Sequence, residues 1–196
     1  ISDWSSDVCS SDLWSQADPQ PSLRLIESVA PGRDASITDI GGGASRLVDA
    51  LVAGGFHDLT VLDLSEAALA SARERIGARG EAVRWVADDA TVWQPPQAFD
   101  IWHDRAAFHF LVEEKDRAAY LDRLHRGVKA GGHAVIGTFA PDGPEKCSGL
   151  PVRRYDSATL GRTIGPAFEL IAHEAHRHVT PWGATQSFQF NVLRRR

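Results

Sequence analysis

Apolar residues recur along the chain with two alternating spacings. Short apolar runs predict buried strands over residues 36–40, 59–62, 82–87, 100–103 and 133–139. Apolar residues at helical spacing predict helices over residues 21–30, 44–53, 65–76 and 116–128. Strands that alternate with helices through short loops predict a parallel sheet with helices on both faces.

The last forty residues follow a different pattern. A short helix is expected near residues 156–164, followed by strands over 169–179 and 186–193. Only Pro181, Trp182, Gly183 and their immediate neighbours separate these strands. So short a connection allows only a hairpin, so the final strand must run antiparallel to its neighbour. We therefore predict an α/β fold with a mostly parallel seven-stranded sheet and an antiparallel C-terminal hairpin strand.

Composition and charge narrow the class of protein. The chain has 196 residues, of which 43% are hydrophobic and 24% charged, which suits one globular domain. The formal net charge is −5 without a long basic run, so we expect no nucleic-acid partner. No apolar run approaches the roughly 20 residues that span a bilayer, so no membrane association is expected. Cys9 and Cys147 cannot form a disulfide framework, and we expect a cytoplasmic monomer.

The first thirteen residues differ from the remainder. They read ISDWSSDVCSSDL, with five Ser and three Asp, and the whole chain contains no Met. Residues 2–13 resemble a translated sequencing-library adapter, so we interpret residues 1–13 as a non-native or disordered tail. Residues 14–196 are then the domain, shortened at its N-terminus.

Candidate ligand-binding residues follow three of the predicted strands. Gly41, Gly42 and Gly43 lie between a strand and a helix, where glycine lets the backbone approach a ligand. Asp63 follows Gly41 by 22 residues and is placed to accept the ribose hydroxyls of an adenosine. Asp88 and Asp89 end the third strand. Because ligands bind at the carboxyl ends of parallel strands, these segments predict one site. The alternatives are a bare turn, a helix-start acid and solvated turn residues.

These motifs resemble those of the class I S-adenosylmethionine-dependent methyltransferases, and the resemblance covers residues 14–196. Asp39, Gly41 and Gly43 match the family's acidic-x-Gly-x-Gly signature, although Ser45 replaces its third small glycine. The resemblance implies a Rossmann-like three-layer sandwich with S-adenosylmethionine as cofactor. The cofactor-binding residues it implies are Asp39, Gly41, Gly42, Gly43, Asp63, Leu64, Asp88, Asp89 and Ala90.

The resemblance implies methyl transfer, and we expect the acceptor to be a small polar metabolite attacked by in-line displacement. A protein lysine side chain is the alternative acceptor. A nicotinamide-dependent oxidoreductase is disfavoured, because Gly-x-Gly-x-x-Gly counted from Gly41 meets Arg46 at its last position. A non-catalytic adenosine-binding module also remains open.

The acceptor side is less well defined. His103, Asp104 and His109 are candidate catalytic bases near the end of the fourth predicted strand, and a structural His103-Asp104-Arg105 cluster is the alternative. Arg105, Arg153 and Arg154 could bind an acceptor's carboxylate or phosphate, or could lie in solvated loops. His176 and His178 share a strand face, but no convincing third ligand accompanies them, so no metal is expected.

Overall fold

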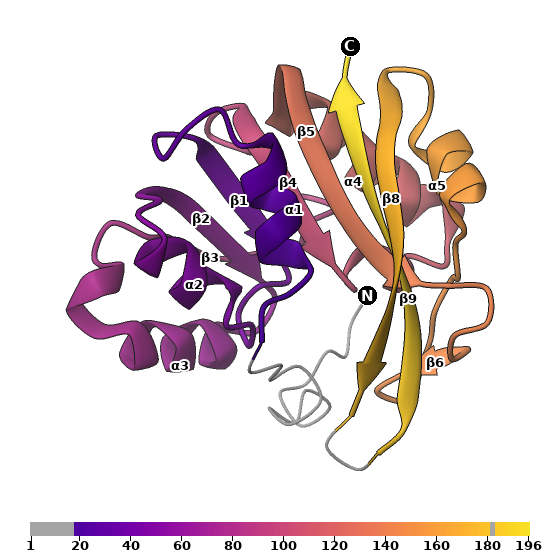
Figure 1. The fold of residues 1–196 in the computed structure, drawn as a ribbon, viewed down its shortest axis with the longest axis horizontal. Helices are drawn as coiled ribbons and strands as arrows, with labels where there is room; N and C mark the ends of the chain where they lie inside the picture. The colour runs from indigo at the N-terminus through magenta and orange to yellow at the C-terminus, as the bar shows by residue number, and fades with distance from the viewer. Residues whose placement is uncertain (1–17, 181–182) are drawn as a thin grey trace.

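The computed structural model describes residues 18–180 and 183–196, which form a three-layer α/β fold around one large sheet (Figure 1). The seven strands lie in the order β3-β2-β1-β4-β5-β9-β8. Their bounds are β1 Ser36–Ile40, β2 Asp58–Asp63, β3 Arg84–Ala87, β4 Phe99–Arg105, β5 Val128–Phe139, β8 Phe168–Val179 and β9 Thr185–Arg195.

The pairing of the strands confirms the predicted topology. β1 pairs in parallel with β2 and β4, β2 with β3, and β4 with β5. β9 inserts between β5 and β8 and is antiparallel to both. The carboxyl ends of the five parallel strands therefore meet at one edge, and the β8–β9 hairpin extends beyond that edge (Figure 1).

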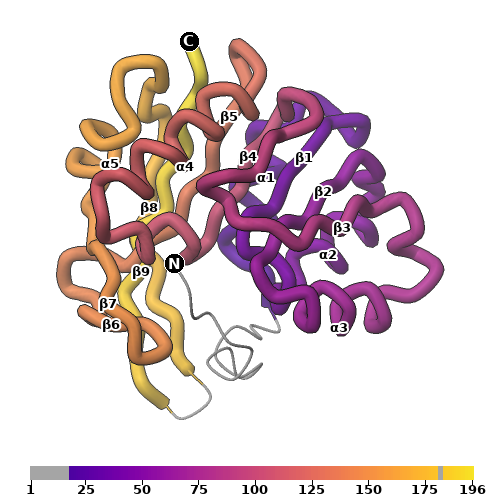
Figure 2. Tube along the Cα trace, turned by 180° about the vertical axis from the view of Figure 1, so that it is seen from behind, coloured from indigo at the N-terminus to yellow at the C-terminus, as the bar shows by residue number. Residues whose placement is uncertain are grey.

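Helices cover both faces of the sheet, and Figure 2 shows the face opposite to that in Figure 1. One core contains apolar residues of α1, α2 and α3 and includes Ile26, Leu51 and Ile101. The other contains residues of α4 and α5 and includes Trp102, Leu124 and Leu160. The helices are α1 Ser22–Val29, α2 Leu47–Ala53, α3 Glu66–Ile76, α4 Glu114–Gly127 and α5 Ser157–Ile164, with short 3₁₀ turns η1 Gly77–Gly80 and η2 Phe108–Phe110.

Most boundaries agree with the sequence pattern to within two or three residues, and α3 shows why. Ser65 caps its first turn by accepting a hydrogen bond from Ala68 N at 3.1 Å, and Gly77 at φ 60° ends it. β5 is longer than predicted because Val128 already pairs with Phe99. The small β6 Lys146–Cys147 and β7 Leu150–Pro151 pair was not predicted, because two-residue strands have no periodicity to read.

Two expectations lie outside the described residues: the non-native tail over residues 1–13 and the Pro181–Trp182 part of the hairpin turn. Among the described residues, no helix has both the length and the apolar character needed to cross a membrane.

Candidate active site

The glycine turn after β1 is a closely packed cradle. Gly41 has φ +72°, and its N–H donates to Leu62 O at 2.8 Å. A Cβ on Gly42 would lie 2.3 Å from Asp39 Oδ2, and one on Gly43 would lie 2.9 Å from Asp63 Oδ2. Glycine is therefore required at both positions for the turn to lie against the two acids.

Asp63, at the end of β2, is tied to this turn. Its Oδ2 accepts from Gly43 N at 2.9 Å and its Oδ1 from Ser65 N at 2.8 Å. Burial raises the pKa of Asp63, and the backbone donors act against that rise. The next side chain, Leu64, is 48% exposed. The end of β2 thus presents an oriented carboxylate beside an exposed apolar side chain.

The end of β3 lies next to Asp63. Asp88 N donates to Asp63 O at 3.1 Å, and Asp88 Oδ1 accepts from Asp89 N at 2.8 Å. Asp89 Oδ1 accepts from both the backbone N and the hydroxyl of Thr91, each at 2.8 Å. Ala90 is partly buried between them. One oxygen of Asp89 therefore shapes the turn, as the turn-residue alternative for Asp88 and Asp89 had expected.

Asp39 belongs to a buried chain of three side chains. Its Oδ1 lies 2.6 Å from His103 Nδ1, and His103 Nε2 lies 2.8 Å from Ser22 Oγ at the start of α1. All three residues are at most 3% exposed. Asp39 Oδ2 is buried and has no hydrogen-bond partner among the described residues. Ser22 was missed in the sequence, because nothing local marks a contact between residues 81 positions apart.

Asp104 faces the opposite side of the sheet from His103, because side chains alternate along a strand. Its carboxylate accepts from Tyr120 Oη at 2.6 Å and from the backbone N of Ala107 and Phe108. Burial raises the pKa of Asp104 to about 6, although these donors favour the ionised form. Tyr120, four residues before the buried Leu124 on α4, was also missed, and that spacing was its one local signal.

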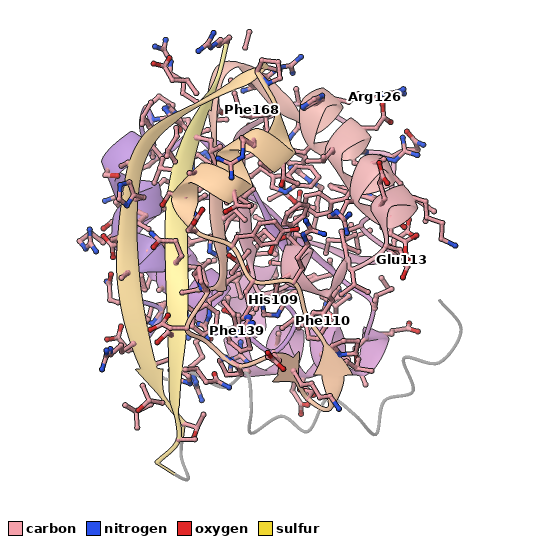
Figure 3. The ribbon with its side chains drawn as sticks, turned by 90° about the vertical axis from the view of Figure 1, so that its right-hand side faces the viewer. His109, Phe110, Glu113, Arg126, Phe139 and Phe168 are labelled. Atoms are coloured by element: carbon pink, nitrogen blue, oxygen red, sulfur yellow. The ribbon has the colours of Figure 1, made fainter. Side chains whose placement is uncertain are left out.

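His109 lies in the core. Its ring centroid is 4.7 Å from those of Phe110 and Phe139, and Figure 3 labels these three residues. Its Nδ1 accepts from Phe139 N at 3.3 Å, and burial lowers the pKa of His109 to about 3. His109 and Asp104 are both 0% exposed. This geometry favours structural roles, and a catalytic role for His103, Asp104 or His109 stays a prediction.

The three predicted substrate-binding arginines have different surroundings. Arg105, at the end of β4, is partly exposed, with its guanidinium carbon 5.8 Å from the centroid of Phe188. Arg153 is exposed beside Tyr155, while Arg154 donates to Gly143 O and Glu145. Arg105 is thus the one that lies at the carboxyl end of a parallel strand.

No group of three His, Cys, Asp or Glu that could hold a metal ion occurs among residues 18–180 and 183–196.

Comparisons with known proteins bear on this site. Residues 37–132, 96 of the 196 residues, match a family model described as a methyltransferase domain. That range includes β1 from its second residue, all of β2, β3 and β4, and every predicted cofactor-binding residue. No curated protein matches the sequence.

Solved methyltransferases share the fold. NodS, an N-methyltransferase from Bradyrhizobium japonicum in complex with S-adenosyl-L-homocysteine, is 20% identical with a TM-score of 0.71, over 96% of this chain and 94% of that one. The 1,6-didemethyltoxoflavin-N1-methyltransferase of Burkholderia thailandensis is 22% identical with a TM-score of 0.70, over 90% of this chain and 77% of that one. A TehB-like methyltransferase of Corynebacterium glutamicum is 24% identical with a TM-score of 0.66, over 91% and 89%.

Residues 37–132 thus carry a match to a methyltransferase domain, and the described residues share the fold of solved S-adenosylmethionine-dependent methyltransferases. The domain match, together with the solved neighbours that bind S-adenosyl-L-homocysteine, supports S-adenosylmethionine as the cofactor and methyl transfer as the class of reaction. The same findings favour a methyltransferase over the nicotinamide-dependent oxidoreductase that the glycine spacing had disfavoured.

Proposed function

We propose that the enzyme methylates a small polar metabolite, with the donor held at the carboxyl ends of β1, β2 and β3. The observation that carries the donor site is the cradle of Gly42 and Gly43 against Asp39 and Asp63. The small-molecule acceptor is supported by the toxoflavin precursor methyltransferase, whose fold this chain shares.

The residues fit the donor in charge and shape. Asp39 Oδ2, buried without a partner among the described residues, would accept from the ammonium group of the donor's methionine part. Asp63 has unused lone pairs beside its two backbone donors and would accept from the ribose hydroxyls. Leu64 would contact the adenine, while Asp88, Asp89 and Ala90 would border it at the end of β3.

When bound, the donor supplies a methyl group already activated on a sulfonium sulfur. The chain's own residues then have to orient the two reactants and exclude water. His103 holds Asp39 and reaches α1 through Ser22, so we assign it a positioning role. Asp104 also has a positioning role, because it accepts hydrogen bonds from the backbone N–H groups of Ala107 and Phe108, which follow β4.

A protein lysine is the second candidate acceptor. The experiment that separates the two candidates is incubation with donor labelled in its methyl group, together with separate metabolite and protein fractions. We expect label in the metabolite fraction. Label confined to the protein fraction would contradict the proposal.

A pair of glycine variants supplies the control. In Gly42→Ala the new Cβ would lie 2.3 Å from Asp39 Oδ2, and in Gly32→Ala it would have no neighbour within 4 Å. Overpacking of this kind costs about 1–3 kcal/mol. We therefore expect Gly42→Ala to lower label transfer about tenfold or more, and Gly32→Ala to leave it unchanged.

A further inference from the structure

Arg105 is a largely desolvated cation with unused donors. It follows Asp104 at the end of β4 and lies on the α1 face of the sheet, as His103 does. Its guanidinium is near the ring of Phe188, and the surrounding protein removes enough water to lower the pKa of Arg105. Among residues 18–180 and 183–196 it forms no ion pair, and its side chain donates no hydrogen bond. Five N–H donors in such a place favour an anionic ligand.

The carboxylates on this face are already paired. Asp39 Oδ1 lies 2.6 Å from His103 Nδ1. Glu174 on β8 accepts two hydrogen bonds from Arg24 of α1, at 2.6 and 2.8 Å. The charge of Asp39 favours the charged form of Arg105, but neither carboxylate forms an ion pair with Arg105 among the described residues.

Two histidines of the hairpin lie on the same face. His176 pairs across β9 with Phe188, the residue beneath Arg105, and His178 pairs with Gln186. Burial lowers the pKa of both histidines, and the Arg105 charge lowers each further. His176 Nε2 is buried and has no hydrogen-bond partner among the described residues. Both histidines therefore lie within electrostatic reach of Arg105, and His176 offers one ring nitrogen that is unpartnered in the described part of the chain.

We propose that Arg105, together with His176 and His178, binds an anionic group of the methyl acceptor, most simply a carboxylate. This inference rests on the proposed function and names its substrate class. Arg105 extends β4 next to β1, whose end carries the glycine turn, so an anion held there lies between the donor cradle and the hairpin. Binding would give the guanidinium the acceptor it lacks and would fix one end of the substrate.

A carboxylate could also come from the donor itself, since the donor's methionine part carries one. Two ligands distinguish these sources: S-adenosylhomocysteine carries the carboxylate and methylthioadenosine does not. If Arg105 binds the acceptor, Arg105→Met leaves the affinity for both ligands unchanged. Weaker binding of S-adenosylhomocysteine alone would assign Arg105 to the donor and overturn the proposal.

The direct test uses benzoate as the anionic probe and benzamide as its neutral counterpart. The full chain is first saturated with S-adenosylhomocysteine, and the imidazole NMR signals of His176 and His178 are then followed during titration. We expect benzoate to shift both signals saturably and benzamide to shift neither. Arg105→Met should weaken benzoate binding at least tenfold, because a charge-assisted hydrogen bond is lost.

Two further variants keep the test decisive. Arg105→Lys retains the charge and should bind benzoate more tightly than Arg105→Met does. Arg177→Gln removes a cation from the same strand, at an exposed position between the two histidines, and should bind benzoate as the wild type does.

The outcomes separate the two proposals. Failure of the wild type to bind S-adenosylhomocysteine would overturn the proposed donor site and this inference with it. Normal binding of S-adenosylhomocysteine with no response to benzoate, or an equal response to benzamide, would overturn the anion site alone.

Discussion

The proposed donor half and the proposed acceptor half of the site are built in different ways. The donor half consists of three turns that follow neighbouring parallel strands, and its groups hold one another through backbone N–H donors, as Gly43 and Ser65 do with Asp63. The acceptor half takes Arg105 from β4 and His176 and His178 from the distant β8. The first arrangement follows from the parallel topology itself, whereas the second depends on where the hairpin crosses the sheet edge.

This difference predicts that substitutions in the two halves have separate effects. Changes in the donor half should weaken donor binding whatever the acceptor is. Changes in the acceptor half should leave donor binding intact. A change to His109, which is buried among aromatic side chains, should alter stability and not chemistry.

Loss of the Asp63 carboxylate should have the largest effect. Two charge-assisted hydrogen bonds to ribose, each worth roughly 1.5–3 kcal/mol, would disappear in Asp63→Ala, so donor affinity should fall more than about a hundredfold. Calorimetry with S-adenosylhomocysteine measures this. Asp58→Asn, at the other end of the same strand, is the matched control. Unchanged affinity in a folded Asp63→Ala protein would remove Asp63 from the donor half.

We expect the buried His109 to make the free energy of unfolding depend on pH. Burial lowers the pKa of His109 to about 3, so below its ordinary value the unfolded chain binds a proton that the folded chain does not. Folded wild type is therefore destabilised as pH falls. Asp104, whose pKa is raised to about 6, titrates in the opposite sense and cancels in a comparison with His109→Asn.

We expect the difference in free energy of unfolding between wild type and His109→Asn to decrease as the pH falls. The free energy of unfolding of His109→Asn should lie below that of wild type near neutral pH, and the gap should shrink by about 2 kcal/mol from about pH 7 to about pH 5. Denaturant titrations at both pH values measure it, with His173→Asn on the exposed face of β8 as the control. A constant gap would show that His109 takes up a proton in the folded protein as it does in the unfolded chain, and would contradict a buried, neutral His109.

Leu64 should give the smallest effect. Its side chain is 48% exposed, so Leu64→Ser should cost the fold little. Loss of its apolar contact with adenine should weaken binding of S-adenosylhomocysteine by about 1 kcal/mol, close to fivefold. Ile171→Ser, at a position 46% exposed on β8, should leave that affinity unchanged. If both variants bind alike, Leu64 does not contact the donor.

The sequence predicted the sheet, its hairpin edge and the turns that follow β1, β2 and β3, because periodicity and glycine spacing are local signals. It did not predict the partners of His103 and Asp104. As neighbours in the chain they suggested one cluster, but as neighbours on a strand they point to opposite faces, toward Ser22 and toward Tyr120. The sequence predicted a strand that ended at residue 103, whereas β4 continues to Arg105, so the alternation of side chains between the two faces extends to Asp104.

Burial separated the remaining candidates. Arg105 and Arg153 are equally polar in the sequence, but one lies at the sheet edge beside Phe188 and the other in an exposed loop beside Tyr155. Such differences depend on packing between segments far apart in the chain. The sequence pattern alone does not show this packing.

The central claim is that the glycine turn binds a methyl donor, and competition between two ligands tests it most directly. The turn has Arg46 where a dinucleotide fingerprint requires its third glycine, and Asp39 lies at the turn where a diphosphate would be repelled. Calorimetry should therefore show saturable binding of S-adenosylhomocysteine at one site, unchanged by excess NADH. Saturable binding of NADH that S-adenosylhomocysteine displaces would contradict the account.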